Sequence, residues 1–125
     1  MGKKKVVRIG NTEFYLDEDE ILHIISHGDI DEEDYNKMSE ATTKVTDTIA
    51  GKVKILVDLN HCGKVPAKMR RMAKGDFEKE KTGKVALFGM HPVARILASF
   101  IIGITRKEDI RFFKTEKEAL AWLQE

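Results

Sequence analysis

Three side chains with catalytic or metal-binding chemistry directly follow two apolar segments of the chain. His61 and Cys62 come soon after the run at 53–59 (VKILVDL), and His91 follows the run at 84–90 (KVALFGM). If both runs are neighbouring parallel strands, these side chains meet at the carboxyl edge of the sheet, where ligand sites of open α/β proteins gather. Two imidazoles and a thiol can bind zinc or form a cysteine–histidine nucleophile pair.

The pattern lacks the features that would make either chemistry specific. The sequence has no CxxC or HExxH spacing, no glycine-rich cofactor motif, and no third group placed to orient a histidine base. Asp58 is the one isolated acid at a strand end, and we expect it to bond the amides of the following turn. The sequence therefore predicts a protein that is not an enzyme and uses no metal and no cofactor.

The same edge of the predicted sheet has features that suit an anion. Pro66 and Pro92 are typical of the first turn of a helix, and the free N–H groups of both helices would point toward these loops. Lys64 and Arg95 lie close to these two helix starts, and the loops also contain the two histidines named above. A phosphate or carboxylate group can bind here, although the pattern GxxxxGK[ST] is missing.

The segment 66–77 has a basic side and an apolar side when it is drawn as a helix. The basic side holds Lys68, Arg70, Arg71 and Lys74, and the apolar side holds Met69, Met72, Ala73 and Phe77. Each base near an anionic membrane contributes about 1 kcal/mol, and methionine suits surfaces that must repack. An ordinary solvated face over a methionine-containing core is the alternative. Nucleic acid is not an expected partner, since no aromatic side chains are interleaved with the bases.

The segment 93–105 (VARILASFIIGIT) is unusually apolar, with Arg95 as its only charged side chain. At about 100° per residue its larger side chains form one broad stripe, which we expect to cover the sheet. This stripe consists of Val93, Ile96, Leu97, Phe100, Ile101 and Ile104. The opposite side then consists of Arg95, Ala98, Ser99 and Ile102. Ile102 is therefore the large apolar side chain expected at the surface.

Together these segments predict a binding or regulatory module whose contact surface is formed by helices 66–77 and 92–105. The expected partner is an anionic membrane surface or an apolar ligand with an acidic head. Apolar contact would come from Met69, Met72 and Ile102. Anion binding would come from Lys64, Lys68, Arg70, Arg71, Arg95, His61 and His91. The alternative is a protein-interaction module, which can be homodimeric, without lipid binding.

Length and composition predict one folded domain spanning residues 1–125. The net charge is only +1, but residues 13–34 hold ten acids and no Lys or Arg, whereas residues 64–84 hold eight bases and three acids. The lone Cys62 excludes an internal disulfide and fits a reducing cytoplasm. The longest apolar run is shorter than the roughly 18 residues of a membrane-spanning helix. The expected location is thus the cytoplasm, where the protein can also be peripheral to a membrane.

Strand and helix signals alternate along most of the chain. Strands are expected at 6–9 and 14–16, joined as a hairpin, and at 21–26, 53–59, 84–90 and 110–113. Helices are expected from Asp31 to a stop near Gly51, from Pro66, from Pro92, and after a capping box at 115–118. His23 and His27 are expected on one face of the third strand. They can act as a pH sensor or simply occupy a half-exposed strand face. The pattern predicts an α/β fold with a mixed, mostly parallel sheet and about four helices.

This order of elements resembles the STAS superfamily, and more closely its SpoIIAA-like family. The resemblance is carried by GDID at 28–31, by ILVDL at 55–59, and by VARILASF at 93–100 followed by IRFFKTEKEALAWL at 110–123. It implies a sheet backed by helices, with the functional region at the loop after Leu59 and the helix near Pro66. In anti-sigma-factor antagonists of the superfamily, a serine of that region is phosphorylated. Residues 60–66 here contain no Ser or Thr.

The SpoIIAA-like family is also similar to CRAL-TRIO lipid-binding domains. That second resemblance implies a mobile helix pair and contact with a membrane or an apolar ligand. Both implications concern the same two segments, 66–77 and 92–105, that the residue pattern selects.

Overall fold

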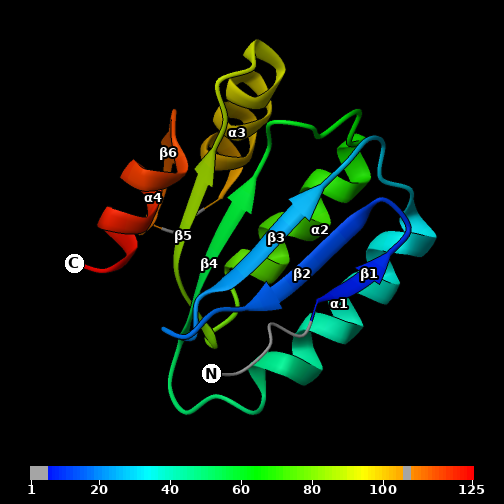
Figure 1. The fold of residues 1–125 in the computed structure, drawn as a ribbon. Coiled ribbons are helices and arrows are strands. Elements are labelled where there is room, and N and C mark those ends of the chain that lie inside the picture. The colour runs from blue at the N-terminus through cyan, green and yellow to red at the C-terminus, as the bar shows by residue number, and fades with distance from the viewer. Residues whose placement is uncertain (1–5, 106–107) are drawn as a thin grey trace.

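The computed structural model describes residues 6–105 and 108–125, which form one mixed sheet with helices on both faces (Figure 1). In this part of the chain the sheet has six strands, β1 (Val7–Ile9), β2 (Thr12–Leu16), β3 (Leu22–Ser26), β4 (Val53–Asp58), β5 (Thr82–Phe88) and β6 (Ile110–Phe113). The helices are α1 (Glu32–Thr46), α2 (Ala67–Phe77), α3 (Pro92–Ile104) and α4 (Glu116–Leu123). The predicted α/β architecture is confirmed.

The strands lie in the sheet in the order of the sequence. Gly10, with a positive φ of 57°, turns the chain between β1 and β2, which pair antiparallel, as β2 and β3 also do. From β3 onward each strand pairs parallel with the next, because a helix carries the chain back across the sheet each time. The carboxyl ends of β3, β4 and β5 therefore share one edge.

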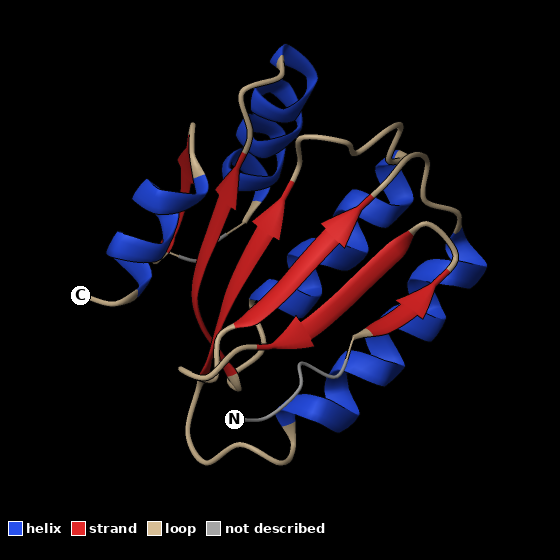
Figure 2. Ribbon diagram, viewed as in Figure 1, coloured by secondary structure: helices blue, strands red, loops and turns tan. Residues whose placement is uncertain are grey.

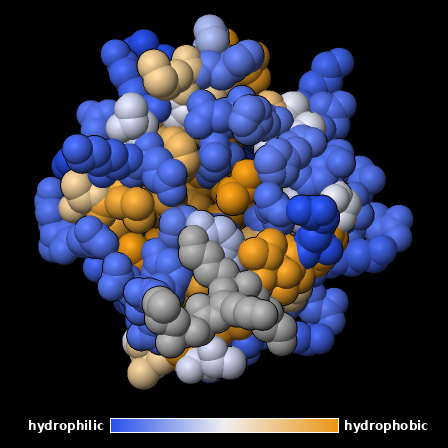
Figure 3. Space-filling model, in the orientation of Figure 1, coloured by the Kyte–Doolittle hydropathy of each residue, from blue (hydrophilic) through white to orange (hydrophobic). Residues whose placement is uncertain are grey.

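Two hydrophobic cores lie on the two faces of the sheet, and Figure 2 shows in blue the helices that cover these faces. The helices α1, α2 and α3 cover one face, and α4 covers the other beside β4, β5 and β6. Leu56 and Ala86 belong to the core under α4, whereas Val57 and Leu87 belong to the larger core. Since β4 and β5 are buried on both faces, their sequences are almost continuously apolar. Figure 3 shows the side opposite to α1, where hydrophilic residues surround smaller apolar areas.

Local sequence signals account for the starts of α1 and α4. The Asp31 carboxylate accepts a hydrogen bond from the Asp34 amide at 2.8 Å, and acidic residues follow in the first turn. The Thr115 hydroxyl accepts from the Glu118 amide, which is one of the two bonds of the predicted capping box, and it donates to the Glu118 carboxylate. The end of α1 differs from expectation, since the helix stops at Thr46 and turns lead on to Gly51.

The orientation of α3 on the sheet contradicts the prediction. Its buried side chains are Ala94, Leu97, Ala98 and Ile101, whereas Val93, Ile96 and Phe100 are exposed. Ala98 is 0% exposed, and a Cβ at Gly89 would lie 2.8 Å from the Cβ of Ala94. The small residues therefore allow α3 to approach the sheet closely, which turns the neighbouring larger side chains outward. Ile102, predicted to be exposed, is half-buried and packs against the larger core.

Two substitutions test this orientation of α3. Ala98→Leu should lower the free energy of unfolding by about 1–3 kcal/mol, because the added atoms have no space beneath the helix. Ile96→Ala should change it by less than about 0.5 kcal/mol, since Ile96 is 69% exposed. Urea unfolding followed by circular dichroism measures both values. A larger loss for Ile96→Ala than for Ala98→Leu would mean that the helix faces the sheet as its periodicity predicted.

Candidate functional site

His61, Cys62 and His91 lie at the carboxyl edge of the sheet, but each has a separate structural role. The ring of His61 stacks on that of His27, with centroids 5.8 Å apart. Cys62 is half-buried and forms an isolated bridge with Gly28. The His91 Nδ1 atom accepts a hydrogen bond from the Val93 amide at 3.1 Å and so caps α3.

Neither a metal site nor an activated thiol is formed by this arrangement. Among residues 6–105 and 108–125, no three His, Cys, Asp or Glu side chains are grouped as metal ligands. Burial, with a smaller contribution from the charge of Asp29, raises the pKa of the Cys62 thiol to about 11. A nucleophilic cysteine requires a lowered pKa instead. The geometry therefore gives no support to the cysteine–histidine interpretation.

The turn after β4 is held by Asp58, as the sequence predicts. Its Oδ1 atom accepts hydrogen bonds from the backbone N of Asn60 at 2.9 Å and from the Asn60 side-chain amide at 3.0 Å. The side-chain oxygen of Asn60 in turn accepts from the Met90 amide at 3.0 Å. Asn60, which sequence reasoning missed, thus connects the loops that follow β4 and β5. An Asx residue two positions after a strand-end aspartate is the signal that was available.

The raised pKa of Cys62 predicts slow alkylation of the folded protein. With a pKa near 11, only about one thiol in ten thousand is ionised at pH 7. The rate of reaction with iodoacetamide should therefore rise throughout the range from neutral pH to about pH 10. Protein unfolded in urea should react faster, and its reaction rate should level off once the pH exceeds the ordinary thiol pKa. A plateau below pH 8 in the folded protein would show an activated thiol.

His23 is buried on the sheet face opposite to α1, and its ring nitrogens have two partners. Its Nε2 atom lies 2.8 Å from the Asp17 carboxylate, and its Nδ1 atom lies 3.2 Å from the Tyr15 hydroxyl. Burial alone would raise the pKa of Asp17, but hydrogen bonds from His23 and from the amides of Ile21 and Asp19 lower it overall. His27 is exposed and contacts Glu13 at 3.1 Å. His27 thus lies one residue beyond the end of β3, and the two histidines have different environments.

The lowered pKa of Asp17 predicts a contribution to acid stability. Since the folded pKa lies below the ordinary value of 3.8, the stabilisation is present above that value and is lost as the pH falls through the folded pKa. Asp17→Asn should lower the free energy of unfolding at pH 7, and its difference from wild type should shrink below pH 3.8. Glu18→Gln, at an exposed neighbour, is the control. If Asp17→Asn and wild type differed in the free energy of unfolding by the same amount at pH 7 and at pH 2.5, the lowered pKa of Asp17 would not account for the difference.

A groove of about 430 Å³ lies between α2 and α3 and is the candidate binding site. Its walls are Gly63, Lys64, Val65, Pro66, Arg70, Val93, Ile96, Leu97 and Phe100. The guanidinium of Arg70 lies over the Phe100 ring, 4.1 Å from its centroid, and donates to the Val65 carbonyl at 3.1 Å. Its Nε atom is buried and has no hydrogen-bond partner within the described residues. The site thus combines an apolar wall with cationic groups.

The structure places the predicted cationic residues in three settings. Lys64 and Arg70 line the groove. Lys68 instead forms an ion pair with Glu32 of α1 at 2.6 Å. Arg71 and Arg95 are exposed, and neither forms an ion pair with any other residue of the described ranges. Of the predicted cationic residues the groove thus includes Lys64 and Arg70, whereas Lys68 is already neutralised.

The predicted apolar contacts are largely replaced by others. Met69 is 3% exposed and belongs to the interior, so its assignment to a contact surface is wrong. Met72 is half-buried, so only part of its side chain is open to contact. Large exposed apolar side chains instead come from α3, namely Val93, Ile96 and Phe100, all three of which line the groove. Ala94 and Ala98, which are four residues apart on one side of α3, were the sequence feature that could have predicted this orientation.

Comparison with known proteins identifies the family of this chain. Residues 21–124 match the SpoIIAA-like family, and the chain belongs to it. A similar solved structure is that of an uncharacterized DUF3478-family protein with a SpoIIAA-like fold from Shewanella loihica PV-4. It aligns with a TM-score of 0.66 and 19% sequence identity over 98% of this chain and 97% of that chain. A search of curated proteins found no match.

Family and fold together support a regulatory or interaction module. The fold is consistent with the STAS superfamily, as the sequence resemblance implied. In the described ranges, none of the helices has the length and apolar character needed to cross a bilayer.

Proposed function

We propose that this protein is a regulatory module that docks on anionic membrane surfaces through the groove between α2 and α3. The observation that carries the proposal is the juxtaposition of exposed apolar side chains of α3 with the cationic groups of Lys64 and Arg70 in one groove. The apolar side chains would enter the region beneath the lipid headgroups. The cations would contact lipid phosphates or carboxylates.

Exposure of the apolar wall supports contact with a non-aqueous surface. Ile96 is 69% exposed and Phe100 is 44% exposed. Other apolar side chains of α3 are buried in the core, so these two are not needed to hold the helix on the sheet. Met90, just before α3, is 73% exposed. Burying a fully exposed aliphatic or aromatic side chain contributes about 1.5–3 kcal/mol. Two or three such side chains are enough for reversible attachment when cations assist.

Charge supports an anionic partner over a neutral one. The residues of α3 include Arg95 and no acid, and Arg71 is exposed on α2. Lys64 and Arg70 stand at the groove itself. Each base close to an anionic lipid surface contributes about 1 kcal/mol, which corresponds to about fivefold in affinity. The Arg70 guanidinium is held in place over the Phe100 ring and by its bond to the Val65 carbonyl, so its positive charge is fixed at the groove wall.

Vesicle co-sedimentation tests the proposal. Wild-type protein should bind vesicles of phosphatidylcholine with phosphatidylserine more strongly than pure phosphatidylcholine, and added salt should weaken the binding. Ile96→Ser should reduce the partition coefficient by about tenfold and Arg95→Gln by about fivefold. Val6→Ser and Lys44→Gln alter an exposed apolar and an exposed basic residue away from the groove, so neither should change it by more than twofold.

Sedimentation velocity distinguishes lipid docking from protein association. The same apolar wall can bind a second copy of the chain or another protein. A protein that stays monomeric over a wide concentration range and binds anionic vesicles agrees with the proposal. A concentration-dependent dimer that Ile96→Ser dissociates, together with indifference to lipid charge, would replace lipid docking by self-association.

A further inference from the structure

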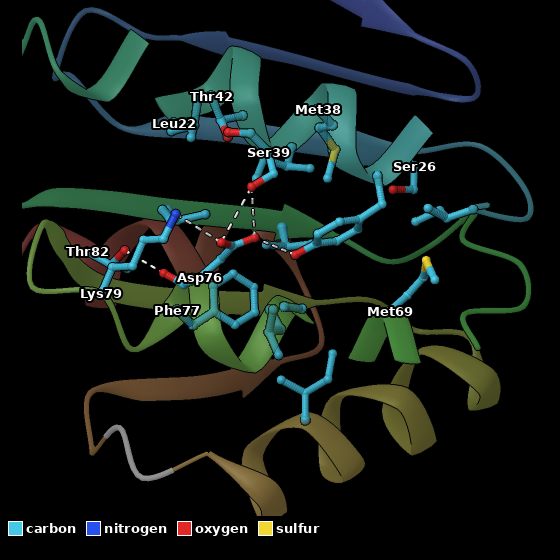
Figure 4. A pocket seen from close by; sticks show the side chains of 18 of the residues that line it. Leu22, Ser26, Met38, Ser39, Thr42, Met69, Asp76, Phe77, Lys79 and Thr82 are labelled. Atoms are coloured by element: carbon cyan, nitrogen blue, oxygen red, sulfur yellow. Dashed lines mark hydrogen bonds and ion pairs between the residues drawn. The ribbon is translucent and has the colours of Figure 1, made fainter. Parts of the chain in front are cut away.

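A second apolar space lies on the other side of α2, between α1, α2 and the sheet (Figure 4). Its volume is about 230 Å³. It shares Val65, Arg70 and Leu97 with the walls of the groove, but most of its lining comes from other elements. The groove is an external surface, whereas this space reaches into the larger hydrophobic core. We refer to it as the inner cavity.

The walls of the inner cavity are mainly apolar. The sheet contributes Leu22, Ile24, Val53, Ile55, Val57 and Leu87. The two helices contribute Met38 from α1 and Met69 and Phe77 from α2. Methionine side chains adapt their shape to an occupant at low cost. The buried position of Met69, which removes it from the external surface, thus places it in this lining.

A polar cluster with Asp76 at its centre interrupts the apolar wall, whose lining also includes Arg70 and Lys81. Figure 4 shows the Asp76 carboxylate between Ser39 and Lys79. Its oxygens lie 2.6 Å from the Tyr35 hydroxyl and 3.1 Å from the Lys79 Nζ atom. Burial and the charge of Asp76 both raise the pKa of Tyr35, so its hydroxyl remains a donor to the carboxylate. The cluster therefore presents an ionised acceptor to the cavity.

The contact between Ser39 and Asp76 is the weak member of this cluster. The Ser39 hydroxyl lies 3.3 and 3.5 Å from the two carboxylate oxygens, whereas good O–H···O bonds are about 2.5–3.0 Å long. A carboxylate has about four lone-pair positions, and Tyr35 and Lys79 occupy two of them well. A ligand hydroxyl or N–H group can therefore replace Ser39 at Asp76 with a shorter bond.

We infer that the inner cavity binds a small, flat or short-chain apolar molecule that donates one hydrogen bond to Asp76. Size sets the upper limit, because a dry cavity of about 150 Å³ holds benzene and this one, at 230 Å³, accommodates a fused two-ring molecule. An acidic head would meet the Asp76 carboxylate at this position, so a hydrogen-bond donor is the better match there. The ligand class is thus a neutral phenol-like, indole-like or alcohol-like compound.

The cavity lining reaches the surface between the carboxyl-terminal ends of α1 and α2. Thr43, Asp47 and Lys79 belong to the lining and are exposed, so they form a polar mouth. This mouth lies on the opposite side of α2 from the groove. The inner cavity is therefore a separate site with a different ligand class, and the inference does not depend on membrane docking.

Indole and benzofuran form a matched pair of probes, because they have nearly the same shape and only indole has an N–H donor. The methionine methyl groups, labelled with ¹³C, report where a probe binds. Indole should shift the signals of Met38 and Met69 saturably and leave that of the exposed Met90 unchanged. Benzofuran should bind about tenfold more weakly, since it cannot donate to the carboxylate.

Two leucine substitutions on α2 provide the structural control. Ala73 lines the inner cavity and Ala67 is exposed outside it. Ala73→Leu should weaken indole binding at least tenfold while the melting temperature stays equal or rises, because the side chain fills the cavity. Ala67→Leu should leave the affinity for indole unchanged. Ser39→Ala, which removes only the weak contact, should retain or tighten it.

Several results would overturn the inference. Equal affinity of wild type for indole and benzofuran would remove the role of Asp76 as acceptor. Undiminished indole binding by Ala73→Leu, or a clear fall in its melting temperature, would mean that the cavity is not the site or not an open space. Indole shifts confined to the groove around Phe100 would assign the probe to the external surface instead.

Discussion

The close contact between α3 and the sheet governs which surface this protein presents. Ala94 and Ala98 have no atoms beyond Cβ, so the helix backbone lies near the sheet, and Leu97 and Ile101 complete the core beneath it. The larger side chains on either side of these four residues, Val93, Ile96 and Phe100, have no space beneath the helix and remain in contact with water. An apolar surface left uncovered in this way is unfavourable in isolation, and contiguous patches of this kind commonly mark contact sites.

The helix α2 separates two apolar spaces whose polar groups differ. On the side of α3, Arg70 and Lys64 give the groove a cationic border. On the side of α1, Asp76 gives the inner cavity an anionic acceptor. Arg70 borders both spaces, so Asp76 is the group that distinguishes the inner cavity from the groove. Our two proposals accordingly assign an anionic surface to the groove and a neutral hydrogen-bond donor to the cavity.

Much of the secondary structure was predictable because its signals are local. The hairpin at Gly10 and the capping box at Thr115 depend on residues a few positions apart, and both were predicted correctly. The strand-end role of Asp58 was predicted for the same reason. The end of α1 was not, since the chain stops being helical at Thr46 without a glycine at that point. The candidate site was predicted only in part: the two helices and their cations were found, but the apolar residues were mostly misassigned.

The sequence by itself determined the element order, the parallel part of the sheet, and the proximity of a basic helix and an apolar helix. It determined them through periodicity, caps and turn residues, which act within a few residues. Only the tertiary structure decided that Ile96 and Phe100 face outward and that Met69 faces inward. Apolar residues occur on nearly every side of α3, so periodicity gives no unique direction toward the core. The choice was made by close packing against distant strands, which α3 approaches through Ala94 and Ala98, with Leu97 and Ile101 filling the core beside them.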